Sequence, residues 1–294
     1  MDICRSNVGP SRAGALKGLS EDSGAALTLP ALSFEVLQKI SEKFGLQALY
    51  TQLRSAHSPV PMVVAGELLT RSPYAGKAAL ASALLTAGFD PNHIHVNGRS
   101  SLDQAANARN EELIDVLITF GADIDGNRNA SGDVALWAAL RWDDDEAVAL
   151  LLAAGADPNI RDHENTLPLS KAITGQITIV NLLLAHGADP NGDSALGHAA
   201  ARANLGTVKA LLAAGANPNQ PDPDGNPPLA FLLKGLMQFK TRQAVARLLL
   251  DAGANPDQSE NGKPSPYDSA AAQFGDKQAS LLFRSSAPLI LADR

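Results

Sequence analysis

The sequence predicts an all-α fold: a solenoid of helix-turn-helix units separated by projecting turns. Three observations support this prediction. A glycine-centred motif recurs about every 33 residues. An amphipathic run precedes each motif, and a shorter, alanine-rich run precedes that one. A repeat of this length indicates units that each bury their apolar face against their neighbours, so that the core runs along the whole array.

The second helix of each unit is predicted by runs such as EAVALLLAA before Gly155 and ITIVNLLLAH before Gly187. Their apolar residues recur at helical spacing. The glycine follows the end of each run, where a left-handed residue satisfies the last carbonyls, and a proline often follows three places later and prevents continuation. We number the copies one to six by their closing glycines, with a seventh copy after them: Gly88, Gly121, Gly155, Gly187, Gly215 and Gly253.

The first helix of each unit is predicted by runs such as ALWAALRW from Ala135 and ALGHAAAR from Ala195. Small residues in these runs let neighbouring backbones approach closely. One leucine recurs at the same place in each copy, which gives a fixed point for aligning them: Leu102, Leu136, Leu169, Leu196 and Leu229.

Composition restricts both the fold and the partners. Hydrophobic residues make up 45% of the chain but aromatic residues only 4%, which favours thin helices packed through Ala, Leu and Val. The 24 basic residues are outnumbered by 31 acidic ones, which argues against binding to nucleic acid or to an anionic membrane. The one cysteine, Cys4, cannot form an internal disulfide, so we expect a cytoplasmic protein. No apolar run is long enough for a membrane helix.

The chain divides into four predicted regions. Residues 1–31 read as a disordered leader, because they are rich in Gly, Ser and Ala. Residues 32–57 form a helical cap, 58–284 the repeat domain and 285–294 a C-terminal tail. The leader also fits an unstructured secretion signal, in which case the protein would act in the cytoplasm of a host cell.

A turn, two helices and a Gly-Ala-Asp-Pro-Asn ending resemble the ankyrin repeat, whose pattern includes Gly-x-Thr-Pro-Leu-His-x-Ala. The matching stretches include 98–105 (GRSSLDQA), 132–139 (GDVALWAA) and 165–172 (NTLPLSKA). No copy keeps the full Thr-Pro-Leu-His sequence, although the Leu and Gly positions are retained. The resemblance covers about residues 58–284. It implies an ankyrin-repeat solenoid that binds another protein and has no enzymatic activity, no cofactor and no small-molecule substrate.

Two copies deviate in length. Leu196 follows Gly187 by nine residues, whereas Leu229 follows Gly215 by fourteen, so about five residues of the projecting turn are missing before copy five. Copy six has about five extra residues around 234–243, either between its helices or extending the first. Drift in a tolerant loop explains both changes. The alternative is that the lost turn opens a notch between copies four and six that fits one partner.

The resemblance also implies where a partner binds, namely at the tips of the projecting turns and on the inner face of the first helices. Basic side chains on that face would favour an acidic partner segment, with Trp142 and Phe231 as apolar anchors. The alternative is that scattered basic residues only solvate a helix face. The predicted binding residues are Ile94, Val96, Asn97, Gln104, Asn107, Arg141, Trp142, Arg161, His163, Lys171, His198, Phe231 and Lys234.

No pattern in the sequence predicts an active site. GDSALGH, starting at Gly192, resembles the opening motif of one lipase family, but Ser194 stands where a helix needs a cap. His93 and His95 lack further ligands at metal-binding spacing. The acidic residues 143–146 precede a second helix, where the helix dipole stabilises them. We therefore expect no catalytic residue and no metal site.

Residues 32–44 resemble the opening of an F-box, with Glu35, Val36, Leu37 and Ile40 at the matching places. Serine replaces the proline of that motif, and an amphipathic capping helix would give the same pattern. The resemblance implies an alternative function as the substrate adaptor of a ubiquitin ligase, of the kind that bacterial effectors supply inside host cells.

Overall fold

The computed structural model describes residues 78–86, 89–94, 98–126, 134–234, 238–259 and 262–283. Within these ranges the fold is helical, and the extended backbone is limited to one isolated bridge between Ile94 and Ser100. The predicted all-α solenoid is confirmed. The predictions for the leader, the helical cap, the F-box-like segment and the C-terminal tail fall outside the described residues.

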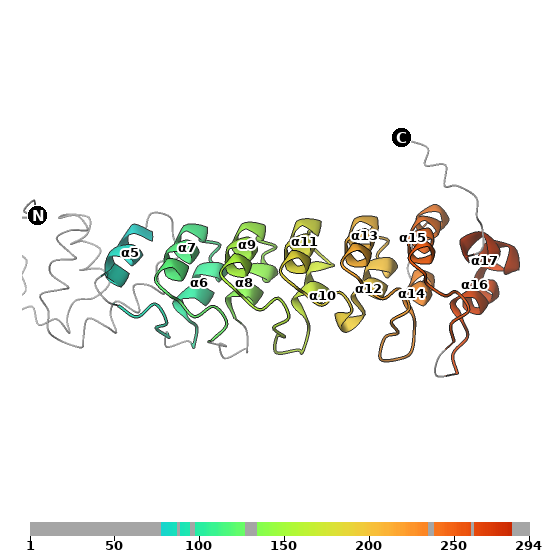
Figure 1. The fold of residues 1–294 in the computed structure, drawn as a ribbon, viewed down its shortest axis with the longest axis horizontal. Helices are drawn as coiled ribbons and strands as arrows, with labels where there is room; N and C mark the ends of the chain where they lie inside the picture. Colours follow the sequence, from blue (N-terminus) through green and yellow to red (C-terminus); the bar gives the residue numbers. More distant parts are fainter. Residues whose placement is uncertain are drawn as a thin grey trace, which may run out of the picture.

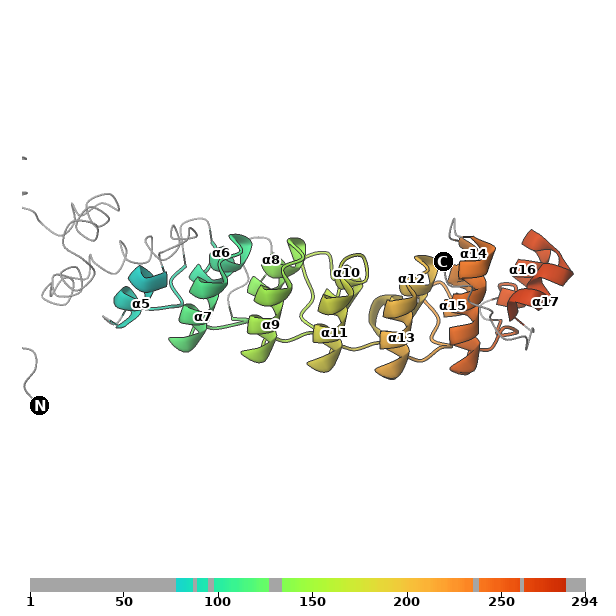
Figure 2. The same ribbon diagram turned by 90° about the horizontal axis from the view of Figure 1, so that it is seen from above.

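The helices stand side by side in two layers that run the length of the molecule (Figures 1 and 2). One layer holds the first helices of the repeats and the other the second helices, while the projecting turns, here called fingers, extend beyond the first-helix layer (Figure 1). The described first helices are α6 (Ser101–Asn107), α8 (Ala135–Arg141), α10 (Pro168–Ala172), α12 (Ala195–Ala201), α14 (Pro228–Lys234) and α16 (Pro266–Phe274). The second helices are α5 (Ala78–Thr86), α7 (Glu111–Thr119), α9 (Asp145–Ala153), α11 (Ile177–Ala185), α13 (Leu205–Ala213), α15 (Phe239–Asp251) and α17 (Asp276–Phe283).

The hydrophobic core extends along the array instead of closing into a globule. From α7 to α15, each second helix packs against its own first helix and against the second helices on either side, as α11 does with α10, α9 and α13. The buried side chains are mostly Ala, Leu and Val, from Ala81 to Leu282. Alanines such as Ala138 and Ala199 are fully buried between neighbouring first helices. The low aromatic content is therefore explained by closely spaced helix layers.

The second helices stop as the sequence predicts. Gly155 adopts φ +97°, and its amide donates to the Leu152 carbonyl at 3.0 Å, while the next amide, of Ala156, donates to Leu151 at the same distance. A side chain at this left-handed position would be strained. Gly121, Gly187, Gly215 and Gly253 repeat this conformation.

The extra residues of copy six lengthen its second helix. Helix α15 has 13 residues, whereas α9, α11 and α13 each have nine. The suggestion that the first helix is extended was wrong, because α14 has seven residues, as do α6, α8 and α12.

A ladder of side-chain hydrogen bonds joins the bases of successive fingers. Asn159 accepts the amide of Asp189 at 2.8 Å and donates to the Gly187 carbonyl at 3.0 Å, and Asn219 makes the same pair of bonds to Asn255 and Gly253. The same amide-to-side-chain link recurs from Asn92, Asp125 and Asn191 to the next repeat. The last residue of the five motifs that start at Gly88, Gly121, Gly155, Gly187 and Gly215 is therefore an inter-repeat connector, and sequence reasoning did not find this role.

Candidate protein-interaction surface

Four first helices each present one exposed cationic or titratable side chain: Arg141 on α8, Lys171 on α10, His198 on α12 and Lys234 on α14. We call this set the palm. It belongs to the layer next to the fingers (Figure 1). The side chains predicted on the same face of α6, Gln104 and Asn107, are only partly exposed.

Phe231 is buried, with 8% of its surface exposed, so its prediction as an exposed anchor was wrong. It packs against His198, with ring centroids 5.5 Å apart, and the Lys234 ammonium lies 4.6 Å from the centre of its ring. Gly197 makes room for it, because a Cβ there would lie 2.9 Å from the ring. The aromatic ring therefore supports His198 and Lys234 from below and holds the ammonium by a cation–π contact.

His198 has a pKa below the ordinary value of 6.5. The largest cause is burial, and the positive charges of Arg202 and Lys234 act in the same direction, while Asp193 and Asp222 oppose them. Between the lowered pKa and 6.5 the unfolded chain binds more protons than the folded one. This contribution to stability is therefore present above pH 6.5 and is lost as the pH falls.

Replacing Arg202 with glutamine should raise the pKa of His198, because a neighbouring positive charge disappears. The measurement is an NMR titration of the histidine ring protons in both proteins. Lys209→Gln on α13 is the matched control, since it removes a charge from the other helix layer. An unchanged titration of His198 in Arg202→Gln would contradict the assigned electrostatic coupling.

Trp142 is 53% exposed and ends α8. Its indole Nε1 donates to the Asn107 side chain of the preceding repeat at 3.3 Å. The ring is therefore both accessible, as its predicted role requires, and oriented by a neighbour.

The predicted finger-tip residues differ in accessibility. Ile94 is 52% exposed, and His163 is exposed and lies 3.9 Å from Glu164. Arg161 instead forms an ion pair with Asp193 at 2.9 Å and donates to the Asn165 carbonyl. Val96 and Asn97 lie outside the described residues.

The short finger before copy five is a single turn, η2 (Gly192–Ser194), in which Asp193 and Ser194 adopt positive φ. The Asp193 carboxylate accepts the Leu167 amide at 2.7 Å and the Ser170 hydroxyl at 3.3 Å. These bonds fasten the short finger to repeat four. The prediction that Ser194 caps α12 was wrong, because its side chain makes no capping hydrogen bond.

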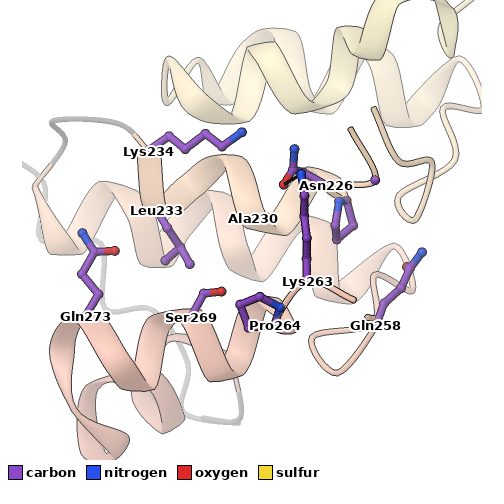
Figure 3. A pocket seen from close by; sticks show the side chains of 11 residues that line it. Asn226, Ala230, Leu233, Lys234, Gln258, Lys263, Pro264, Ser269 and Gln273 are labelled. Carbon is purple, nitrogen blue, oxygen red and sulfur yellow. Dashed lines mark hydrogen bonds between the residues drawn. The ribbon is translucent and has the colours of Figure 1, made fainter. Parts of the chain in front are cut away.

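Of the two hollows described below, the larger one does not lie beside the short finger, where the notch was expected. A recess next to Ser194 and Pro228 holds only about 10 Å³, less than a water molecule occupies in the liquid. A hollow of about 290 Å³ opens one repeat further on, between α14 and α16 (Figure 3). Lys263 lines it and was missed from sequence, although it follows Gly262 as Asn226 follows Gly225 in the preceding finger.

No three His, Cys, Asp or Glu side chains among the described residues gather closely enough to hold a metal ion. No helix within the described ranges combines the length and the apolar character that crossing a membrane requires.

Comparison with known families gives an independent assignment. A family model described as ankyrin repeats, in three copies, matches residues 71–162, 155–222 and 169–260. The chain belongs to the ankyrin-repeat family. This family indicates a protein–protein interaction module, and its fold is typically a non-enzymatic scaffold.

Two curated proteins are similar over more than half of the chain. The chain is 33% identical to bovine mitochondrial disaggregase over 54% of its own length and 24% of the relative's. It is 30% identical to the mouse B-cell lymphoma 3 protein homolog over 64% of its length and 42% of that protein's. The chain thus spans less than half of these two curated relatives.

Solved structures show the same fold. The ankyrin repeat domain of Bcl-3 superimposes with a TM-score of 0.61 at 21% identity, covering 71% of this chain and 96% of that one. An ankyrin repeat domain from Acinetobacter baumannii gives 0.56 at 32% identity, covering 62% and 95% of the two chains.

Proposed function

We propose that this ankyrin-repeat chain binds a partner protein through the concave side of its first-helix layer and the tips of its fingers. The observation that carries the proposal is the palm, where α8, α10 and α14 each expose one cationic side chain and α12 exposes His198. A solenoid offers an extended surface of this kind, and a partner can contact several repeats at once.

The charge of the palm supports an acidic segment as the bound part of the partner. The whole chain has a net charge of -7, yet Arg141, Lys171 and Lys234 are exposed along one layer. No carboxylate in the described ranges lies within ion-pair distance of Lys171 or Lys234. Exposed lysines without an ion-pair partner are available to steer and orient an acidic partner.

Site-specific photo-crosslinking tests which layer holds the partner. A crosslinking amino acid replaces Lys171 in the palm in one variant and Lys209, which is exposed on α13 in the second-helix layer, in the other. We expect the partner to be captured through position 171 and not through 209. Equal capture from both positions, or capture from 209 alone, would refute the proposed binding face.

A further inference from the structure

The hollow between repeats six and seven is built from two first helices and two fingers. Leu233 and Lys234 come from α14, Ser269 and Gln273 from α16, and Asn226 and Lys263 from the fingers that precede those helices. Figure 3 shows the Lys263 side chain extending across the hollow to Asn226. The space, about 290 Å³, is at the lower limit of small-molecule pockets and would hold about ten water molecules.

The lining of this hollow is cationic and amide-rich. Two lysines, Lys234 and Lys263, line it, and none of the eleven lining residues is a carboxylate. Gln273 and Ser269 add polar groups that can donate hydrogen bonds, whereas the side-chain amides of Asn226 and Gln258 already donate to the Asp222 carboxylate and the Asn219 carbonyl. In a chain where acids outnumber bases 31 to 24, this composition selects for an anionic occupant.

Both lysines are held by neutral groups in direct contact, while the Asp222 carboxylate, which the Lys234 charge stabilises, lies behind Asn226. The Lys263 ammonium donates to Asn226 Oδ1 at 3.2 Å, and Asn226 in turn donates through Nδ2 to the Asp222 carboxylate at 2.8 Å. The Lys234 ammonium lies over the Phe231 ring. Within the described residues neither lysine forms an ion pair with a carboxylate. Holding the charges in place beforehand reduces the entropy lost when an anion binds.

We propose that this hollow receives a glutamate side chain from an extended acidic segment of the partner, as the anchor of the interaction. This inference rests on the proposed function. Lys234 and Lys263 bind the carboxylate, and the apolar part of the lining, Leu233, Pro227 and Pro264, contacts the methylene stem. The volume admits a glutamate side chain together with water, and the rest of the segment continues along the palm toward Lys171.

A defined peptide tests the hollow without knowledge of the partner. The probe is a fluorescein-labelled peptide in which Glu alternates with Ser and Ala, and its matched control carries Gln in place of Glu. We expect fluorescence anisotropy to show binding of the Glu peptide only. Lys263→Gln, and Ser269→Leu, which fills the space without a change of charge, should each weaken binding at least about fivefold. Lys209→Gln should leave it unchanged.

Competition by inorganic phosphate distinguishes the chemistry of the anion. We expect phosphate to displace the peptide poorly, since it cannot use the apolar contacts. Displacement by phosphate at the same concentration as free glutamate would overturn the assignment to a carboxylate side chain. Equal binding of the Gln peptide, or full binding to Lys263→Gln and Ser269→Leu with unchanged melting curves, would overturn the site itself.

The crosslinked partner separates this inference from the function on which it rests. If Lys263→Gln and Ser269→Leu bind the partner with unchanged affinity while crosslinking still maps to position 171, the hollow is not the anchor and the palm stands. If crosslinking maps to position 209, the proposed function fails whatever the peptide does.

Discussion

Reversing Arg141, Lys171 and Lys234 to glutamate in one variant should weaken binding of the partner by about 3 kcal/mol or more, a change in Kd of over about a hundredfold. The three side chains are exposed on three of the four successive first helices α8, α10, α12 and α14, so like charges would face an acidic segment along its length. Helicity and melting should be almost unchanged, since exposed substitutions usually alter stability by about 0.5 kcal/mol or less. Isothermal titration calorimetry gives the affinity and circular dichroism the fold.

The chain supplies a matched control for this variant. Lys209, Lys240 and Lys277 are exposed on second helices, and reversing them changes the net charge by nearly the same amount on the other layer. Their reversal should cost far less affinity. Added salt should weaken the wild-type complex, because exposed charges are screened over about 8 Å at physiological ionic strength. Equal losses in both triple variants would show that only the overall charge matters.

Truncating Leu183 to alanine should destabilise the array by about 2–5 kcal/mol. Leu183 is fully buried in α11, in the middle of the solenoid, where α11 packs against α9, α10 and α13. Stability in a repeat array is a sum of local and neighbour terms, so weakening a central unit uncouples the two ends. Chemical unfolding followed by circular dichroism should shift to lower denaturant and broaden.

Asn181→Ala is the control for the leucine substitution, since Asn181 is exposed on the same helix and should change stability by about 0.5 kcal/mol or less. A sharp single transition in Leu183→Ala with an unchanged midpoint would mean that α11 does not link its neighbours. Comparable destabilisation by Asn181→Ala would point to an effect on α11 itself instead of the core.

Local rules predicted the fold because each repeat is determined by short-range chemistry. Gly155 predicts a left-handed helix end and Ala138 predicts a close contact between first helices. The same residue types recur in several repeats, which strengthens both predictions. Length arithmetic located the short finger and the insertion for the same reason. The length arithmetic could not show that α15 takes up the extra residues, because a longer connection or a longer helix gives the same residue count.

The surface was harder to predict because accessibility depends on neighbours in other repeats. Phe231 occupies a palm position by spacing, but the missing side chain of Gly197 lets it turn inward under His198. Ser194 occupies a capping position by sequence, but η2 places it in the left-handed region. Lys263 belongs to the seventh repeat, whose sequence departs most from the others, and its partner Asn226 lies 37 residues away.

The hydrogen-bond ladder at the finger bases separates the spacing of the repeats from the length of the fingers. Asn159 reaches Asp189, and Asn191 reaches Asn217, on either side of the shortened finger. The shortened finger makes these links through Asp189 and Asn191, which both precede its tip, Gly192–Ser194. Residues can therefore be removed from the tip or added to it without breaking either hydrogen bond. The fingers of this chain can therefore be lengthened or shortened one at a time on an unchanged backbone, which gives a direct way to vary the proposed binding surface.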